Sequence, residues 1–171
     1  MKRILCVLVI LTVMLTGCKK SDSNTENPTT GTQAADEAFK YIIGDALLIP
    51  GTDFADAYAV LGEPVSYTEA ASCYFDGMDK IYTYDGFEVR TYPVEGDRDF
   101  VLDVCMSSDE FKTDKGITVG SALEDMVSAY GEDYELVGKM YRYYSEPGKY
   151  MYFFVMNDVV KYFGYAVDAI N

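Results

Sequence analysis

Two segments of the chain, 51–62 and 120–131, share one pattern of apolar and polar positions. In each, a glycine followed by a hydroxyl residue comes first, apolar residues recur at helical spacing, and a second glycine follows eleven positions after the first. This spacing predicts a short amphipathic helix with a hydroxyl N-cap and a glycine just past its C-terminus. Ser121 and Glu124 also have the spacing of a capping box. The matching apolar positions are Phe54, Ala57, Tyr58 and Leu61, and Leu123, Met126, Val127 and Tyr130.

After each predicted helix, apolar and polar residues alternate, which indicates half-buried strands. Asp85 and Gly86 separate two such runs, and this pair favours a tight hairpin turn with positive φ. The runs that predict strands are 80–84, 87–92 and 100–106 after the first helix, and 139–143, 150–156 and 159–166 after the second. Residues 65–75 lengthen the first copy and predict an extra edge strand, and residues 36–47 predict a further helix.

The order of these elements predicts an α+β fold built as a tandem repeat. Each copy consists of a short helix followed by a three- to four-stranded antiparallel sheet, and the helices pack on one sheet face. The first copy covers about residues 45–110 and the second about residues 111–168, within a folded part that spans 37–171.

Strand alternation divides the side chains of the first hairpin into two sets. We expect the first set to face the core beneath the helix; it contains Ile81, Thr83, Phe87, Val89 and Thr91. The second set includes a charged pair, and because an unpaired buried charge is costly, we expect this set to face solvent. It contains Tyr82, Tyr84, Glu88, Arg90 and Tyr92, and Tyr141 and Tyr143 of the second copy fall on the equivalent outer face.

The first residues of the chain have the pattern of a secretory signal peptide. Lys2 and Arg3 precede an apolar run over 4–15, which is shorter than the about 20 residues that span a bilayer. The run ends in Leu15-Thr16-Gly17-Cys18, which resembles the bacterial lipoprotein box. That resemblance implies removal of residues 1–17 and attachment of acyl chains, such as palmitate, to Cys18. An ordinary signal peptide and an uncleaved anchor are the alternatives.

Residues 18–36 contain no aromatic side chain, and after Cys18 no aliphatic side chain larger than alanine. This composition is typical of a flexible tether between an anchor and a folded domain. We therefore expect a protein that is lipid-anchored at the extracytoplasmic face of the cell membrane and contacts the membrane only through its lipid.

Charge and composition exclude several classes of function. The chain of 171 residues has 14 basic and 28 acidic side chains, and its formal net charge of −14 becomes −16 when Lys2 and Arg3 are removed. Such a surface repels phosphate backbones, so we expect no nucleic-acid partner. The chain contains no histidine, which removes imidazole bases, histidine-activated nucleophiles and the commonest zinc ligand. No cofactor and no metal site are expected.

Three pairs of acidic residues could in principle act as glycosidase carboxylates. They lie in turn-like polar stretches, where aspartate commonly bends the chain, and none has the spacing of a calcium loop. We therefore interpret them as solvated turn residues, expect no catalytic residue, and rank a carbohydrate or peptidoglycan hydrolase last. The pairs are Asp76 and Asp79, Asp97 and Asp99, and Asp109 and Glu110.

Two of the four cysteines are expected to remain in the folded part. Cys6 leaves with the signal peptide and Cys18 carries lipid, so that Cys73 and Cys105 are left. An even pair in an exported domain indicates a disulfide. Two separate buried thiols are the alternative, because cysteine packs well in apolar surroundings.

The two helix-plus-strand copies, with Leu61-Gly62-Glu63-Pro64 after the first helix, resemble the β-lactamase inhibitory protein fold. They are more distantly similar to small outer-membrane-assembly lipoproteins, which carry one copy. The stretches 72–87 and 113–120 are similar to uncharacterised lipoproteins of Firmicutes. The resemblance covers about residues 45–168 and implies a concave, aromatic-rich sheet face that binds a target enzyme.

Tyrosine combines a large apolar area with a polar tip, which suits protein recognition. Together with the resemblance, the expected outer tyrosines predict a non-enzymatic lipoprotein that binds an envelope or secreted protein, with inhibition of an enzyme as one form of that binding. A structural lipoprotein of envelope assembly is the alternative. In that case the tyrosines only shield the sheet from water.

Overall fold

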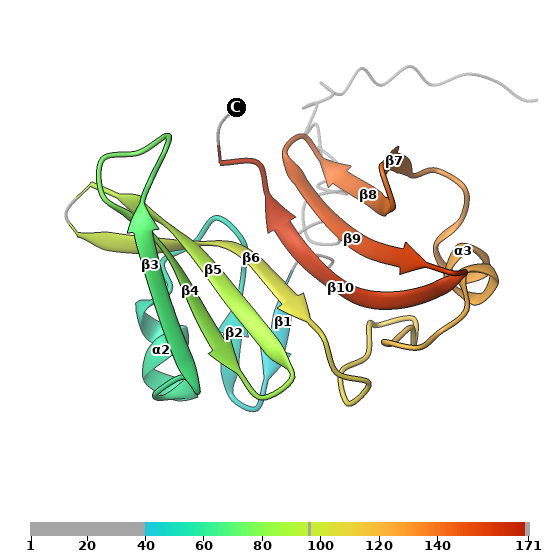
Figure 1. The fold of residues 1–171 in the computed structure, drawn as a ribbon, viewed down its shortest axis with the longest axis horizontal. Helices are drawn as coiled ribbons and strands as arrows, with labels where there is room; N and C mark the ends of the chain where they lie inside the picture. The colour runs from blue at the N-terminus through green and yellow to red at the C-terminus, as the bar shows by residue number, and fades with distance from the viewer. Residues whose placement is uncertain (1–39, 96, 170–171) are drawn as a thin grey trace, which may run out of the picture. The chain divides into compact units, whose positions relative to one another are not determined.

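An eight-stranded antiparallel sheet makes up most of the structure (Figure 1). The computed structural model describes residues 40–95 and 97–169. The strand order is β3-β4-β5-β6-β10-β9-β8-β7, so that β6 pairs with β10 at the centre of the sheet. The strands are β3 (Ser66–Ala71), β4 (Met78–Tyr84), β5 (Phe87–Val94), β6 (Arg98–Met106), β7 (Glu135–Val137), β8 (Met140–Glu146), β9 (Lys149–Met156) and β10 (Val159–Val167).

The strands agree with the alternating runs of the sequence. Each of the six predicted strands is present, and the extra residues of the first copy form β3, the predicted edge strand. The predicted signal peptide, the lipidation site Cys18 and the tether over 18–36 lie outside the described residues.

A two-stranded sheet replaces part of the helix that was predicted at 36–47. Strand β1 (Tyr41–Ile43) pairs with β2 (Ala46–Leu48) around Gly44, which has a φ of 60°. A glycine tolerates this left-handed conformation, so Gly44 and Asp45 form a tight turn where the helix would have continued. The helix prediction is therefore wrong over residues 41–47.

Both repeated segments form helices, α2 (Ala55–Leu61) and α3 (Leu123–Tyr130). The glycine ends are confirmed: Gly62 and Gly131 have φ values of 74° and 89°, and their amides donate to carbonyl oxygens in the last helical turn. The prediction of hydroxyl N-caps is wrong, because the N-cap residues are Phe54 and Ala122 and neither helix has a side-chain cap hydrogen bond. Ser121 instead accepts a hydrogen bond from the Thr118 amide at 3.1 Å, so it does not form the capping box with Glu124.

The core lies between these helices and one face of the large sheet. The ring of Phe54, the N-cap residue of α2, lies 4.9 Å from the Tyr82 ring, and the Tyr130 ring of α3 lies 5.2 Å from the Phe153 ring. Cross-strand pairing places Tyr82 and Phe153 on the same sheet face, so both helices cover that face. Its most buried side chains are Val89, Val104, Met106, Phe153, Val160 and Phe163. We call this side the helix face.

The predicted α+β tandem repeat of helix-plus-sheet units is wrong as a description of the fold. Over residues 40–95 and 97–169 the structure is mostly β, with one continuous eight-stranded sheet, a two-stranded sheet and two helices of seven and eight residues. The strands of the two copies do not form separate sheets because Asp103 to Met106 of β6 pair with Phe163 to Ala166 of β10. That pairing satisfies the backbone groups that would otherwise be left at two sheet edges.

The predicted outer face of the first hairpin is wrong for Tyr82 and Tyr84. Both rings lie on the helix face and are 9% exposed. The two-residue turn at Asp85 and Gly86 places Tyr84 directly opposite Phe87, and directly opposed residues share a sheet face. The sequence-based assignment placed them on opposite faces, which is a one-residue error in β4.

Tyr141 and Tyr143 are also on the helix face, opposite Phe153 and Met151. The Tyr143 hydroxyl donates to the carbonyl oxygen of Gly131 at 3.0 Å, and the Tyr84 hydroxyl donates to that of Gly62 at 3.1 Å. Carbonyl groups at the end of a helix lack partners within it. These tyrosines therefore fix the C-terminal ends of α2 and α3 against the sheet.

Within residues 40–95 and 97–169, neither helix has the length and apolar character needed to cross a bilayer.

Candidate binding site on the open sheet face

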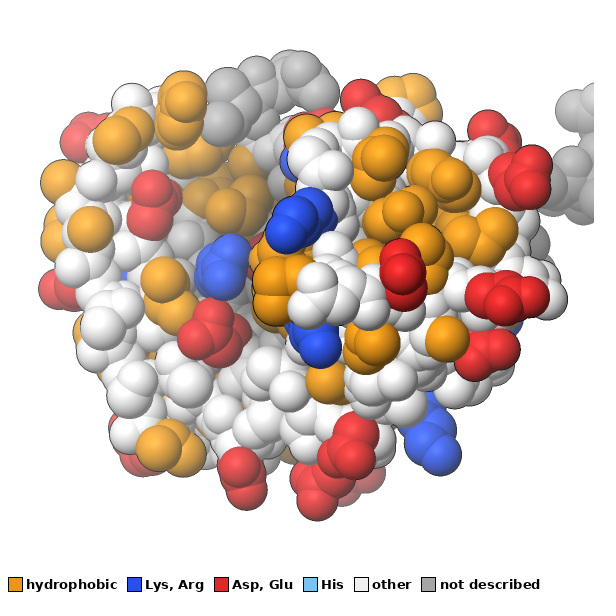
Figure 2. Space-filling view, turned by 45° about the vertical axis from the view of Figure 1, so that its right-hand side comes forward, with side chains coloured by type: hydrophobic (Ala, Val, Ile, Leu, Met, Phe, Trp, Pro, Cys, Tyr) orange, Lys and Arg blue, Asp and Glu red, His pale blue; other side chains and the backbone are white. Residues whose placement is uncertain are grey.

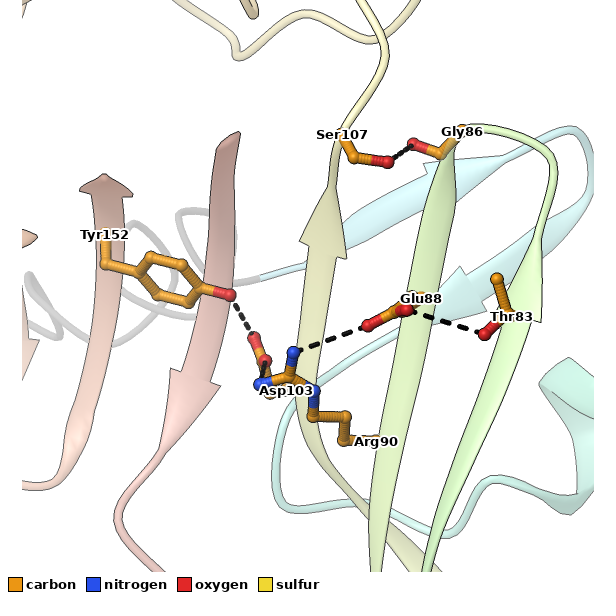
Figure 3. A network of polar contacts seen from close by, with 7 residues as sticks. All are labelled: Thr83, Gly86, Glu88, Arg90, Asp103, Ser107 and Tyr152. Atoms are coloured by element: carbon orange, nitrogen blue, oxygen red, sulfur yellow. Dashed lines mark hydrogen bonds and ion pairs between the residues drawn. The ribbon is translucent and has the colours of Figure 1, made fainter. Parts of the chain in front are cut away.

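The sheet face opposite the helices, which we call the open face, carries a polar cluster at its centre (Figure 3). Asp103 of β6 accepts a hydrogen bond from the Tyr152 hydroxyl of β9 at 2.7 Å. Its other oxygen lies 3.4 Å from the Arg90 guanidinium of β5. Arg90 also lies 3.3 Å from Glu88, so the cluster joins three strands through side chains.

Gly164 of β10 allows Tyr152 to reach Asp103. Tyr152 and Cys105 pair with Gly164 from its two sides, so the Tyr152 ring crosses β10 to reach β6, as Figure 3 shows. A Cβ atom at Gly164 would lie 2.6 Å from the Tyr152 hydroxyl oxygen and 2.4 Å from the Val104 carbonyl oxygen. Any side chain at this position would therefore displace the tyrosine or the neighbouring strand.

Burial dominates the electrostatics of Asp103. The residue is 6% exposed, and desolvation raises the pKa of its carboxyl group to about 6, although the Tyr152 hydrogen bond and the Arg90 charge act in the opposite direction. Burial and the neighbouring Asp103 charge raise the pKa of Tyr152 well above its ordinary value. The tyrosine therefore stays protonated and acts as a donor to Asp103 at neutral pH.

A pocket of about 500 Å³ opens beside this cluster. Arg142 of β8 lies over the Tyr150 ring, with its guanidinium carbon 4.8 Å from the ring centre. Its Nε atom is buried and has no hydrogen-bond partner among the described residues, and no described acidic residue forms an ion pair with it. The other polar and aromatic lining residues are Arg90, Asp103, Tyr152, Tyr162 and Asp168.

The pocket differs in charge from most of this acidic protein. In Figure 2, basic side chains (blue) gather near the middle of the visible face among hydrophobic ones (orange), while acidic side chains (red) are scattered around them. Arginine and tyrosine together provide hydrogen-bond donors and broad apolar area, so the pocket can hold a side chain with an acceptor group and an apolar stem.

Only part of the predicted binding set lies near this pocket. Arg90 lines it and Glu88 pairs with Arg90, whereas Tyr92 is half-buried farther along β5, with its ring 5.1 Å from the Phe75 ring. Tyr82, Tyr84, Tyr141 and Tyr143 lie on the opposite face and cannot contribute to the same surface.

The pocket residues of the second half of the chain were not predicted from the sequence; they are Arg142, Tyr150, Tyr152 and Tyr162. Tyr150 and Tyr152 lie within a run that is apolar or aromatic at nearly every position. Alternation therefore does not reveal which face of this strand is directed outward. One signal was present: Gly164 lies inside the strand-forming run 159–166, and an isolated glycine in a strand marks a close approach by another group.

The predicted disulfide is absent, because Cys73 and Cys105 are both free. Through successive strand pairs Cys105 is level with Ser66 at the start of β3, whereas Cys73 follows the end of β3. Three strand spacings, about 14 Å, also separate β3 from β6, which exceeds the reach of a disulfide. Burial raises the pKa of the Cys105 thiol to about 11, so this cysteine is a protonated, packed residue.

The pocket contains two carboxyl groups, Asp103 and Asp168, which invites comparison with a hydrolase site. Both oxygens of Asp103 are engaged within the protein, by Tyr152 and by Arg90. A general acid must present its proton to a substrate, and this arrangement leaves Asp103 no free oxygen for that role. Among the described residues there is also no cluster of three metal-ligating side chains.

A scan of protein-family models, a search of curated proteins and a search of solved structures each found no match to this chain. The resemblance to β-lactamase inhibitory proteins therefore stays a prediction.

We predict that Asp103 makes stability depend on pH. Because folding raises its pKa from 3.8 to about 6, the folded protein binds more protons than the unfolded chain between these values. Its contribution to stability is therefore largest below pH 4 and is lost as the pH rises through about 6. Relative to Asp103→Asn, the wild type should lose about 2–3 kcal/mol of unfolding free energy across this window.

Urea unfolding of both proteins at a series of pH values measures this difference, and Asp103→Asn removes the titration while keeping the side-chain size. A stability difference that stays constant with pH would show that Arg90 and Tyr152 cancel the effect of burial. A difference that grows in favour of the wild type as pH rises would show that they outweigh it. Either result contradicts the prediction.

Proposed function

We propose that this chain is a membrane-anchored extracytoplasmic lipoprotein that binds an envelope or secreted protein through the open face of its sheet, without catalysing a reaction. The observation that carries the proposal is the pocket of about 500 Å³ lined by tyrosines and two arginines. Tyrosine and arginine are enriched among the residues that dominate protein–protein binding energy. Inhibition of an enzyme is the form of binding that the resemblance to β-lactamase inhibitory proteins suggests.

Arg142 is the centre of the proposed contact. Stacking on Tyr150 and a hydrogen bond with Tyr144 orient its guanidinium. The guanidinium forms no ion pair with a described residue, although the charge of Asp168 acts on it. A partner that inserts a carboxylate or carbonyl oxygen beside this group would gain a charge-assisted hydrogen bond. Tyr162, stacked on Phe154 at 4.6 Å, provides a rigid apolar wall for the same inserted side chain.

A structural role in envelope assembly is the second candidate, and the edges of the sheet support it. All residues of β3 and of β7 are exposed. An exposed edge strand can accept a strand from another protein by backbone hydrogen bonding. A hydrolase ranks below both, because the oxygens of the most perturbed carboxyl group, Asp103, are already occupied.

The anchor is tested by Cys18→Ser in the full chain. We expect the variant either to leave the membrane fraction or to accumulate as an unprocessed precursor, because no thiol remains to be lipidated. Fractionation followed by intact-mass measurement separates these results. A variant that stays in the membrane at the mature size would contradict the proposed lipoprotein anchor.

The binding face is tested by capturing partners from the native envelope with the full, tagged chain. Tyr162→Ala and Arg142→Ala should reduce recovery of a partner about tenfold or more, because each removes part of the pocket wall. Tyr74→Ala is the matched control, since Tyr74 is 70% exposed in the loop between β3 and β4.

Thermal unfolding of the same variants should show that they remain folded. If folded Tyr162→Ala and Arg142→Ala capture a partner as well as the control does, the open-face pocket is not the contact. The exposed strand edges would then be the surface to examine.

A further inference from the structure

A second pocket lies on the other side of the molecule, where α2 meets the β3 edge of the sheet. It has a volume of about 570 Å³ and is separate in its lining from the pocket on the open face. Its walls combine aromatic rings with acidic side chains; the aromatic residues are Phe54, Tyr58, Tyr67 and Tyr82. We call it the tyrosine pocket.

The rings are arranged as a floor and two walls. Tyr82, which is 9% exposed, forms the floor. The Tyr58 ring from α2 lies 5.7 Å from the Tyr82 ring at 59°, and the Tyr67 ring from β3 lies 5.1 Å away at 52°. The walls therefore come from different elements and are tilted relative to the floor, so faces and edges of three rings border one space.

Acidic groups surround these rings. The pocket is lined by Asp53, Glu63, Asp97 and Asp99, against the single basic residue Arg98. One of the acids is neutralised, because Lys80 pairs with Asp99 at 2.7 Å. The Tyr67 hydroxyl donates to Glu69, which adds a further carboxylate beside the wall. The remaining charge is negative, and it adds to the net charge of the chain.

We propose that the tyrosine pocket binds an alkylammonium group. The face of an aromatic ring attracts a cation within about 6 Å of its centre, and sites that recognise quaternary ammonium or methylated lysine are built from several such rings. Aromatic rings alone would also suit a neutral apolar group, but the surrounding carboxylates favour a cation over it. An anion would be repelled by the same carboxylates.

Two sources could supply this group: the side chain of a lysine in another protein, and a choline headgroup. Both present an ammonium on an alkyl stem, and they differ in size and in hydrogen-bonding capacity. Lysine ammonium can also donate to Glu63, whereas a quaternary ammonium cannot. The pocket does not depend on the proposed open-face contact, so either proposal can fail without the other.

The test is NMR titration of the ¹⁵N-labelled full chain in a maltoside detergent, which contains no ammonium group. Choline is compared with its neutral isostere 3,3-dimethyl-1-butanol, and Nα-acetyl-lysine amide is compared with Nα-acetyl-norleucine amide. We expect saturable amide shifts around Tyr58, Tyr67 and Tyr82 with at least one cation, and binding of its neutral partner about threefold or more weaker. The cation that binds more tightly identifies the source.

Variants locate the binding in the pocket. Tyr67→Ala, which removes a wall that is 45% exposed, should weaken the cation about threefold or more. Tyr67→Phe keeps the ring and loses only the bond to Glu69, so it should retain most of the affinity. Tyr74→Ala removes an exposed tyrosine elsewhere and should leave binding unchanged.

Equal binding of the cations and their neutral isosteres would overturn the proposal, as would an absence of saturable shifts for both cations. Tyr67→Ala that binds as well as Tyr74→Ala would also overturn it, because the cation would then bind outside the tyrosine pocket.

Discussion

The hydrogen bond from Tyr152 to Asp103 is the interaction on which the large sheet depends. It begins on β9, passes over Gly164 of β10 and ends on β6 at 2.7 Å, so it spans the seam at which the two groups of four strands meet. Asp103 continues the connection to Arg90 on β5. One set of side chains thus links three strands, β9, β6 and β5, across β10, and it does so only because Gly164 has no side chain.

The same interaction also shapes the candidate binding site. Asp103, Arg90 and Tyr152 form one wall of the open-face pocket while they are engaged with one another. Burying a carboxylate costs free energy, which the raised pKa of Asp103 reflects, and even a paired buried charge commonly contributes less stability than well-packed apolar side chains. The hydrogen-bonded cluster nevertheless fixes the position of the pocket wall beside Arg142 and Tyr150, where a partner is proposed to insert. Rigid walls reduce the entropy that is lost on binding.

The sequence predicted local structure well and side-chain direction poorly. Glycine positions such as Gly62 and Gly131 located the helix ends, and the alternating runs located the strands, because turns and strand periodicity depend on nearby residues. The direction of Tyr82 and Tyr84 depends on the pairing register across Asp85 and Gly86, and an error of one residue reverses every side chain of a strand. A two-residue turn at Asp85 and Gly86 pairs Tyr84 with Phe87, so the length of the turn determines this register.

Other features could not be obtained from local pattern. The merging of the strands into one sheet depends on pairing between β6 and β10, which are more than fifty residues apart in the sequence. Residues 36–47 have apolar side chains at helical spacing, yet residues 41–48 form a hairpin that packs Leu48 into the core. The pairing of Cys73 with Cys105 was inferred from their number and compartment, whereas the structure places Cys73 in the loop after β3 and Cys105 in β6, level with the opposite end of β3.

A double-mutant cycle between Tyr152 and Asp103 tests the central interaction most directly. The unfolding free energies of the wild type, Tyr152→Phe, Asp103→Ala and the double variant are measured at pH 8, where the Asp103 carboxyl group is ionised. Alanine, unlike asparagine, leaves no acceptor for the Tyr152 hydroxyl. A hydrogen bond to a buried carboxylate that joins the two groups of strands predicts a favourable coupling energy of about 1.5–3 kcal/mol. A coupling energy below about 0.5 kcal/mol, with additive effects of the two substitutions, would contradict the role assigned to this bond.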